Sequence, residues 1–507
     1  MISSEDFSRY DVRTYLVVSL ITAFAVWYIK FLWNRKYLYI YSWKVEGPLS
    51  FPFLGCGYLL LGNLINNITK QQAKSRTGIV RFWMGMNLVY LLSEPIHLQK
   101  VLSHPKALEK DYSYKYVTET IGEGLLSAPV NVWKRHRKLL APSFNHRVLN
   151  TAVGIFTEYS VNFAKELQAV VGKKNFDLYA WTIRCTFDLI CKTSMGINVE
   201  TQKNRGDQGI LFERAFEIMS YRMFRVWNHL DFVWYYSPNK KIFDGIYSKL
   251  YDLLHPLISK KFIEFKKELS GKHLDAEIEE ESLYEKRLPF LDSMLLDPSI
   301  TEKKVQDEAV AFALAGSETT ASSICFLFSL LGLFPEVQQK VYEEMIDILG
   351  PDRNVEAFDL PKMKYTERVI KENLRLFPIA ALVARRIEED INLGDVILPA
   401  GSSVAFNLLY IHRNPKYWTE PLKFDPDRFL PEEIAKRHPC TFIPFLYGPR
   451  NCLGWKYAFL NMKIIIATVV REFKIFTEYK SIEEMEVVFH FTIQLKNGPK
   501  VWLERRR

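Results

Sequence analysis

The chain has 507 residues, of which 48% are hydrophobic and 14% aromatic, and it carries 67 Lys and Arg against 58 Asp and Glu. This composition excludes an intrinsically disordered chain, which is poorer in hydrophobic residues, and a multi-spanning membrane protein, which is much richer in them. Six scattered cysteines form no CxxC pair, which argues against a zinc ribbon or disulfide scaffold. The net charge of +9 fits an anionic partner or a membrane surface and identifies neither.

Residues 15–33 form the first long apolar segment. About nineteen residues at a rise of 1.5 Å reach roughly the 30 Å of a bilayer core. A buried helix and a cleavable signal peptide are the alternatives, but aromatic residues such as Trp27 and Trp33 stand where a signal peptidase requires small ones. The flank 34–44 has three basic residues and no acid. We therefore predict a membrane anchor at residues 1–33, with a lumenal N-terminus and a cytosolic remainder, in the endoplasmic reticulum membrane.

A proline-punctuated stretch, residues 46–52, follows the anchor and is predicted to be non-helical, within a hinge that covers residues 34–55. Residues 56–507 contain no low-complexity linker and are predicted to form one large domain. The sequence Asn67-Ile68-Thr69 is a glycosylation sequon. We expect it to be unmodified, because this part of the chain should face the cytosol, and a glycosidase-sensitive mass shift would contradict that orientation.

Helical periodicity dominates the large domain, so the predicted fold class is mainly α with small β-sheets (α+β), plus one transmembrane helix. Helical runs are expected at 243–269 and 301–349, strands near 79–92, 396–404 and 486–502, and an exposed charged loop at 271–286.

Residues 445–454, Phe-Leu-Tyr-Gly-Pro-Arg-Asn-Cys-Leu-Gly, precede an apolar helix expected at 458–470. They place Cys452 in a tight loop before a helix N-terminus, where backbone N–H groups and the helix dipole favour a thiolate. Such a thiolate suits a soft metal or a nucleophilic reaction, whereas the alternative is an ordinary buried free cysteine.

The pattern FxxGxRxCxG in this segment resembles the haem-binding signature of the cytochrome P450 family, through Phe445, Gly448, Arg450, Cys452 and Gly454. The resemblance implies the cytochrome P450 fold and a haem b whose iron is bound by the Cys452 thiolate. It makes residues 56–507 a haem-thiolate catalytic domain.

Two further motifs extend the resemblance. Glu372 and Arg375 form ExxR in a helical run expected at 366–377, and with Arg428 they resemble the family's structural Glu-Arg-Arg triad. Asp427 stands where Glu is more frequent in that motif, and we expect this change to be tolerated.

Haem propionates need cations. Trp133 and Arg137 match the family's WxxxR, and Arg385 and Arg450 occupy the other two matching positions, so the resemblance implies that these four residues contact the propionates. Solvated surface charge is the alternative for each arginine.

The apolar run 307–333 contains Glu318, which would be costly in lipid, so we predict a buried helix of the soluble domain. Gly316 allows close approach of another group to this helix. Glu318 and Thr319 match the family's oxygen-activation motif and are the predicted catalytic residues, because an acid beside a hydroxyl suits proton delivery to a metal-bound ligand. The alternatives are a Thr hydroxyl bonded to its own helix and a Glu in an ion pair.

Residues 122–144 and 177–196 resemble the fatty-acid ω-hydroxylase branch of the family, particularly its insect members. Many members have a Glu at the position of Ala315 that forms an ester to a haem methyl group. Ala315 has no carboxylate, so we predict haem that is not covalently bound. The same departure weakens the expectation of selectivity for the terminal carbon.

Apolar residues at positions that match the family's substrate segments are the predicted substrate contacts, with ordinary core packing as the alternative. They are Phe312, Ala315, Thr319, Ile379, Leu382 and Val383, with the loop 125–130 beside them. A candidate docking face for a flavoprotein reductase is formed by Lys134, Arg135 and Lys138, and an ordinary solvated face is the alternative. If reversal of all three charges left reductase-coupled turnover unchanged, the docking face would be contradicted.

The resemblance implies a membrane-anchored monooxygenase that inserts one oxygen atom of O2 into a fatty acid, hormone-like lipid or xenobiotic. Electrons would come from NADPH through a reductase, with a cytochrome b-type protein as a second candidate donor, and no nucleic acid is expected as a partner. The alternatives are a haem-thiolate isomerase or dehydratase, which needs no proton relay, and a non-catalytic haem-binding protein.

Overall fold

The computed structural model describes residues 4–506 except 175, 205–207, 273–289, 296 and 298–299. The expected exposed loop at 271–286 therefore lies almost wholly outside the described residues.

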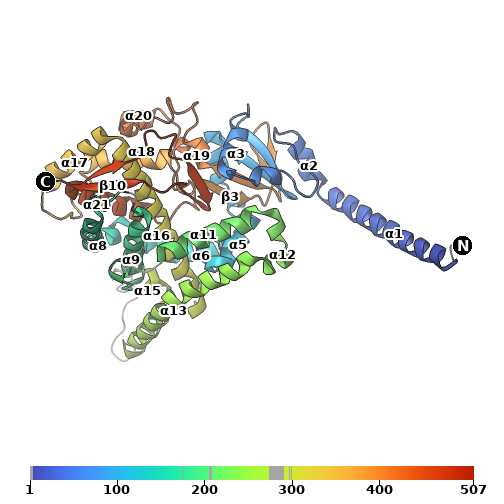
Figure 1. The fold of residues 1–507 in the computed structure, drawn as a ribbon, viewed down its shortest axis with the longest axis horizontal. Helices are drawn as coiled ribbons and strands as arrows, with labels where there is room; N and C mark the ends of the chain where they lie inside the picture. Colours follow the sequence, from blue (N-terminus) through green and yellow to red (C-terminus); the bar gives the residue numbers. More distant parts are fainter. Residues whose placement is uncertain are drawn as a thin grey trace.

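Helices form most of the described chain and small sheets the rest, which confirms the predicted fold class (Figure 1). The helices are α1 Ser4–Asn34, α2 Lys36–Trp43, α3 Leu64–Gln72, α4 Pro95–Leu102, α5 Lys115–Ile121, α6 Val130–Leu140, α7 His146–Thr151, α8 Val153–Leu167, α9 Leu178–Ile190, α10 Thr201–Asn204, α11 Gln208–Phe224, α12 Asp231–Tyr235, α13 Pro238–Lys272, α15 Phe290–Leu295, α16 Glu302–Leu333, α17 Pro335–Leu349, α18 Lys364–Leu376, α19 Leu408–Ile411, α20 Pro431–Ala435 and α21 Trp455–Glu472. The strands are β1 Ile79–Met84, β2 Asn87–Leu92, β3 Leu382–Arg386, β4 Ile391–Asn392, β5 Ile397–Leu398, β6 Ser403–Asn407, β7 Phe473–Thr477, β8 Val487–His490, β9 Thr492–Leu495 and β10 Val501–Arg505.

Helix α1 projects away from the body of the molecule (Figure 1). Its apolar part, Val12–Asn34, has a mean hydropathy of 1.9 and is long enough to cross a membrane, and none of it is buried. Helix α16 passes the same test of length and composition, but 78% of its apolar window is buried within the protein. The prediction that residues 307–333 form a buried helix of the soluble domain is thus confirmed.

Helix α16 runs through the middle of the body and joins two apolar cores (Figure 1). Thr301 caps its first turn, because the Thr301 side chain accepts a hydrogen bond from the Lys304 amide. Its first half packs through residues such as Leu314 with α9 and α13, and its second half packs through residues such as Leu330 with β7. Most side chains at the centre of α16 are therefore packed against neighbouring elements, which fixes the position of the helix.

One four-stranded sheet, in the order β1-β2-β6-β3, lies next to α2 and α3. The β1–β2 and β3–β6 pairs are antiparallel, and β2 and β6 are parallel. Opposite Arg385 in β3 stands Val404 in β6, so this register fixes which side of β3 faces the interior.

Two expected segments differ in detail from the structure. The helical run expected at 301–349 is two helices, because α16 ends at Leu333 and Pro335 begins α17. Proline has no N–H and is tolerated in the first turn of a helix, so it marks the break. Within the predicted hinge, residues 46–52 are non-helical as expected, but Lys36–Trp43 forms the short helix α2.

Candidate active site

Cys452 lies in the loop that leads into α21. The Cys452 amide donates to the Phe445 carbonyl oxygen at 2.9 Å, which closes the loop, and the Phe445 ring packs 5.6 Å from that of Phe459. Gly448 has a φ of +79°, and a Cβ there would collide with the Leu102 carbonyl oxygen. The spacing of the motif therefore has a steric cause, because only glycine fits at this turn.

Cys452 is exposed, unlike the other five cysteines, so its thiol is open to a ligand. Burial raises the pKa of the thiol, while the Gly454 amide and the Arg137 cation lower it by less. The amide expected to favour a thiolate is present, but it does not outweigh burial. A cation at the sulfur, such as iron, deprotonates a coordinating thiol, and the donor chemistry of this site suits it.

Three cations gather near this loop: Arg385, Arg450 and Lys110. The first two are buried, and among the described residues no carboxylate forms an ion pair with any of the three. Burial together with the neighbouring arginines lowers the pKa of Lys110 well below its usual value. Two buried arginines and a half-buried lysine without an ion-paired carboxylate among the described residues fit a group that carries two carboxylates, as haem does.

The arginines are placed by backbone contacts. Arg450 donates to the carbonyl oxygens of Leu108 (2.6 Å) and Ala128, and its guanidinium lies 4.9 Å from the ring centre of Trp133. Arg137 holds the cysteine loop, because it donates to the carbonyl and side-chain oxygens of Asn451 at 2.8 and 2.7 Å.

Lys110 is a candidate cofactor contact that the sequence analysis missed. It pairs with Arg385 through an isolated β-bridge, and its ammonium lies 4.3 Å from the ring centre of Tyr114. Position 110 belongs to no motif, so only the pairing of two segments 275 residues apart could reveal it.

Phe312, Ala315, Gly316 and Thr319 are all half-buried in a helix whose other central residues are buried. The spacing of Phe312, Ala315 and Thr319 places them on one face, so this face borders an internal space. The Thr319 hydroxyl donates to the Ala315 carbonyl oxygen at 2.7 Å. A Cβ at Gly316 would lie 2.8 Å from Ile190, so this glycine permits the close approach of α9, as expected.

Glu318 is fully buried beside Thr319. One carboxylate oxygen accepts hydrogen bonds from Ser322 (3.0 Å), Thr492 (2.8 Å) and Gln494 (3.3 Å), and the other oxygen has no partner among the described residues. Burial outweighs these hydrogen bonds and raises the pKa of Glu318 to about 7. A carboxyl group that titrates near neutral pH suits proton transfer, and it forms no ion pair with any described residue.

An apolar cavity lies between the four-stranded sheet, the end of α11 and the β8–β9 hairpin. Leu382 lines this cavity, whereas Val383 points to the other face of β3 and Ile379 is buried in the core. The sequence analysis missed several lining residues, namely Trp83, Tyr114, Met223, Phe224, Phe489 and Phe491. Phe312 is not among the lining residues, and its ring stacks on Phe290 at 4.2 Å.

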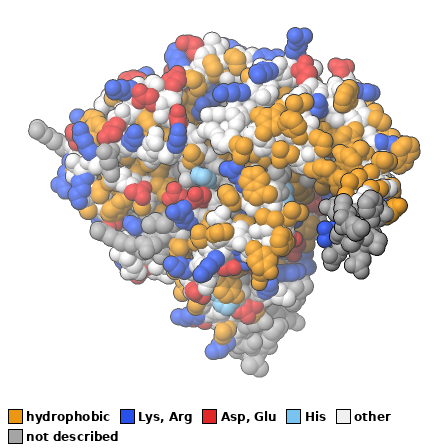
Figure 2. Space-filling view, turned by 45° about the vertical axis from the view of Figure 1, so that its right-hand side comes forward, with side chains coloured by type: hydrophobic (Ala, Val, Ile, Leu, Met, Phe, Trp, Pro, Cys, Tyr) orange, Lys and Arg blue, Asp and Glu red, His pale blue; other side chains and the backbone are white. Residues whose placement is uncertain are grey.

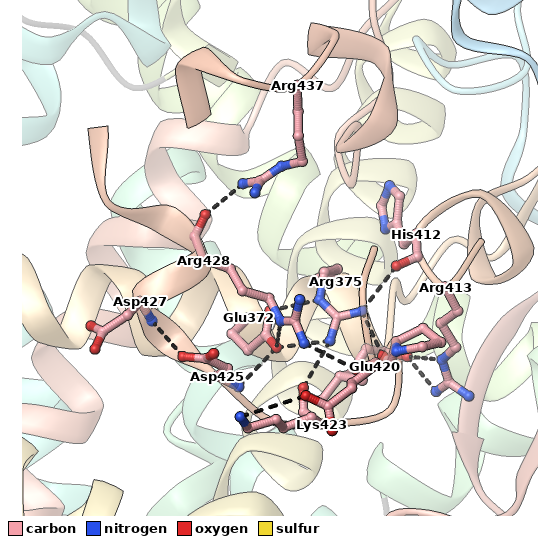
Figure 3. A network of polar contacts seen from close by, with 12 residues as sticks. Glu372, Arg375, His412, Arg413, Glu420, Lys423, Asp425, Asp427, Arg428 and Arg437 are labelled. Carbon is pink, nitrogen blue, oxygen red and sulfur yellow. Dashed lines mark hydrogen bonds and ion pairs between the residues drawn. The ribbon is translucent and has the colours of Figure 1, made fainter. Parts of the chain in front are cut away.

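The predicted triad forms part of a network of polar contacts (Figure 3). Arg375 donates to both oxygens of Glu372 at 2.6 and 2.7 Å, and the Arg428 Nε lies 3.5 Å from the same carboxylate. Arg375 also donates to the carbonyl oxygens of His412 and Pro421. The Asp427 side chain pairs with Arg368 at 3.1 Å, while its backbone amide donates to the Asp425 carboxylate at 3.1 Å within this network.

A family model described as Cytochrome P450 matches residues 45–498. The chain belongs to the cytochrome P450 family. It is 32% identical to Cytochrome P450 4c3 of Drosophila melanogaster, over 98% of this chain and 96% of that protein. It is 30% identical to Cytochrome P450 4c21 of Blattella germanica, over 86% and 88% of the two chains, and 31% identical to human Cytochrome P450 4V2, over 85% and 82%. These relatives confirm the expected branch and its insect members.

Membership of the cytochrome P450 family makes this chain a monooxygenase, with haem b as its cofactor and a cysteine thiolate as the iron ligand. The exposed Cys452 thiol and the three cations near its loop fit that cofactor.

Proposed function

We propose that this cytochrome P450 is a membrane-anchored enzyme that inserts one oxygen atom of O2 into a lipophilic substrate, with fatty acids as the first candidates. The observation that carries this proposal is the buried Glu318 carboxyl beside Thr319, on the helix whose half-buried face borders an internal space. A carboxyl with a pKa of about 7 is suited to supply protons, which a haem-thiolate isomerase or a haem carrier does not need.

The individual roles follow from the contacts above. Cys452 would bind the iron, and the haem would supply the oxidation chemistry. Arg385, Arg450 and Lys110 would bind the propionates, with Trp133 beneath Arg450 and with Arg137 holding the cysteine loop. Ala315 offers no carboxylate, so the haem would be held without a covalent bond.

Proton delivery is assigned to Glu318 and Thr319. Glu318 would take up a proton from the side of Thr492 and Gln494. The Thr319 hydroxyl donates to the Ala315 carbonyl oxygen in this structure and would turn from that bond to pass a proton toward the reacting oxygen. The groups that donate hydrogen bonds to Glu318 are neutral and the carboxylate of Glu213 adds to the upward shift, so the pKa of Glu318 is raised mainly by burial.

Helix α1 is proposed to anchor the enzyme in the endoplasmic reticulum membrane with a lumenal N-terminus. Exposed apolar side chains on the body support this placement, and Figure 2 shows them gathered on the side that carries α1. They belong to the segment after α2 (Leu49, Phe51, Phe53, Leu54) and to the region around α12 (Trp227, Leu230, Phe232, Tyr235, Tyr236). The Phe53 ring lies 4.9 Å from that of Tyr28 in α1, so the two apolar surfaces are continuous.

The electron donor is proposed to be an NADPH-dependent flavoprotein reductase. Lys134 and Lys138 are exposed on α6 and available for an acidic partner. Arg135, the third residue of the predicted docking face, donates to Asp297 at 2.6 and 2.8 Å, so part of its charge is already neutralised. The two lysines would therefore carry most of the salt-dependent attraction.

The proposed activity is tested with purified enzyme, reductase, NADPH and a panel of fatty acids and other lipids. Oxygenated product that requires NADPH, O2 and reductase together supports the proposal. Conversion of a substrate without O2 would support the isomerase or dehydratase alternative instead.

A further inference from the structure

Glu308 is a fully buried carboxylate that the proposed mechanism does not use. It lies on α16 and accepts the Leu125 amide hydrogen with both oxygens, at 3.1 and 2.8 Å. The second oxygen also lies 3.3 Å from the Nδ1 of His136, which is 2% exposed and belongs to α6. One carboxylate thus connects α16, the loop at residues 122–129 and α6.

Two glycines let the backbone of this loop reach α16. A Cβ at Gly124 would lie 2.8 Å from the Glu308 Oε2 and 3.0 Å from the Ala311 Cβ. Gly122 has a φ of +79°, and a Cβ there would collide with the side chain of Asp307. The Gly-Glu-Gly sequence at 122–124 resembles the ω-hydroxylase branch. Its two glycines are required sterically, because a Cβ at either position would collide with Asp307 or Glu308.

The 122–129 loop is also held by a hydrogen bond near its C-terminal end and by hydrogen bonds between its own residues. Ala128 accepts a hydrogen bond from Arg450, and the Ala128 and Ser127 amides both donate to the Gly124 carbonyl oxygen at 2.9 and 3.1 Å. The Ser127 hydroxyl donates to the Gly122 carbonyl oxygen at 3.0 Å. With these bonds in place, the contact at Glu308 decides how the whole loop is placed against α16.

Glu308 lies on the same face of α16 as Phe312, Ala315 and Thr319, because spacings of 4, 7 and 11 residues return to one side of a helix. The loop held by Glu308 therefore forms a wall at one end of the face that borders the internal space. Burial raises the pKa of Glu308, and His136 and the Leu125 amide lower it by less.

We infer that Glu308 is a positioning residue, which fixes the 122–129 loop against α16 and so determines the shape of the substrate site beside Ala315 and Thr319. This inference rests on the proposed function for the location of the substrate site. Glu308 touches no reacting group in this arrangement and acts through the loop.

The test compares Glu308→Ala and Gly124→Ala with the parent holoenzyme, and uses Glu302→Gln, on the same helix, as the matched control. Amide hydrogen exchange of residues 122–129 is expected to be about tenfold faster in both variants, because a buried bond to a charged acceptor is lost or displaced. The dissociation constant of dodecanoic acid, measured from the shift of the haem absorption band, should rise about tenfold as well. Haem content should match the parent, and Glu308→Gln, which keeps an accepting oxygen, should restore most of the protection.

Parent-like exchange of residues 122–129 in Glu308→Ala would overturn the inference, as would faster exchange with an unchanged dodecanoic acid dissociation constant. If Glu308→Ala does not retain haem, Gly124→Ala decides by the same two outcomes, because it leaves Glu308 and His136 in place. If the parent itself gives no shift with dodecanoic acid, the fatty-acid part of the proposed function is contradicted. In that case, the same comparison is made with 4-phenylimidazole as the ligand. Faster exchange of residues 122–129 with a higher dissociation constant of 4-phenylimidazole in Glu308→Ala supports the role of Glu308, and a parent-like value of either quantity overturns it.

Discussion

The carboxylate of Glu318 accepts a hydrogen bond from the Thr492 hydroxyl at 2.8 Å, which joins the middle of α16 to the β8–β9 hairpin. Ser322 and Gln494 donate to the same oxygen, so the carboxyl is held by neutral groups. A cation at this place would have kept the carboxylate ionised. The neutral setting leaves burial as the dominant effect and brings the pKa to about 7.

Glu318→Gln tests this setting directly. We expect product formation to fall about 10²-fold, because the amide keeps the hydrogen bonds and cannot deliver a proton. In the parent, the rate should decline as the pH rises through about 7, since the protonated form of Glu318 is lost there. The pH profile of kcat should lose this step in the variant, whereas Glu302→Gln should keep it. A variant with the parent's rate and pH profile would contradict proton delivery by Glu318.

The Glu372–Arg375 pair is expected to support stability and not chemistry. Both side chains are fully buried, so Glu372→Ala leaves an unpaired buried arginine and should destabilise the protein by about 3–5 kcal/mol. The partly exposed pair of Arg368 with Asp427 is the control, and Arg368→Ala should change the free energy of unfolding by less than about 1 kcal/mol. Urea unfolding measures both values. Equal effects in the two variants would contradict the structural role of the triad.

Lys110 is expected to contribute to haem retention. Lys110→Met removes one of the three enclosed cations, and transfer of haem to an excess of apomyoglobin should become about tenfold faster. Lys106→Met is the matched control, because Lys106 is exposed and pairs with Glu389. Haem transfer at the parent's rate in Lys110→Met would remove Lys110 from the proposed propionate site.

The motifs around Cys452, Glu372 and Arg385 could be found in the sequence because each is a local spacing that the fold uses directly. The break between α16 and α17 is marked in the sequence by Pro335, although one continuous run was expected at 301–349. Lys110, Thr492 and Gln494 could not be found in this way. Each reaches the site by pairing with a segment far away in the sequence, and such contacts leave no local pattern.

The substrate residues show the same limit. The separation of Leu382 from Val383 depends on the register of β3 against β6, which composition does not reveal. The glycines at 122 and 124 were visible as a resemblance, but their partners Asp307 and Glu308 became apparent only when the loop was placed on α16.

Ala315 leads to a prediction about the attachment of the haem. No carboxylate is present at this position, so acid extraction with an organic solvent should release all of the haem as free haem b. The release is measured by chromatography of both phases. Haem that stays with the polypeptide after extraction would show a covalent bond from another residue.

The proposed reaction is the insertion of one atom of molecular oxygen into a lipophilic substrate. It is tested most directly by turnover of the lipid panel under ¹⁸O₂, with NADPH and reductase, followed by mass spectrometry of the product. We predict a product that carries one ¹⁸O atom, and no such product from Cys452→Ser. Product that carries no label, or labelled product from Cys452→Ser in the parent's amount, would contradict the account.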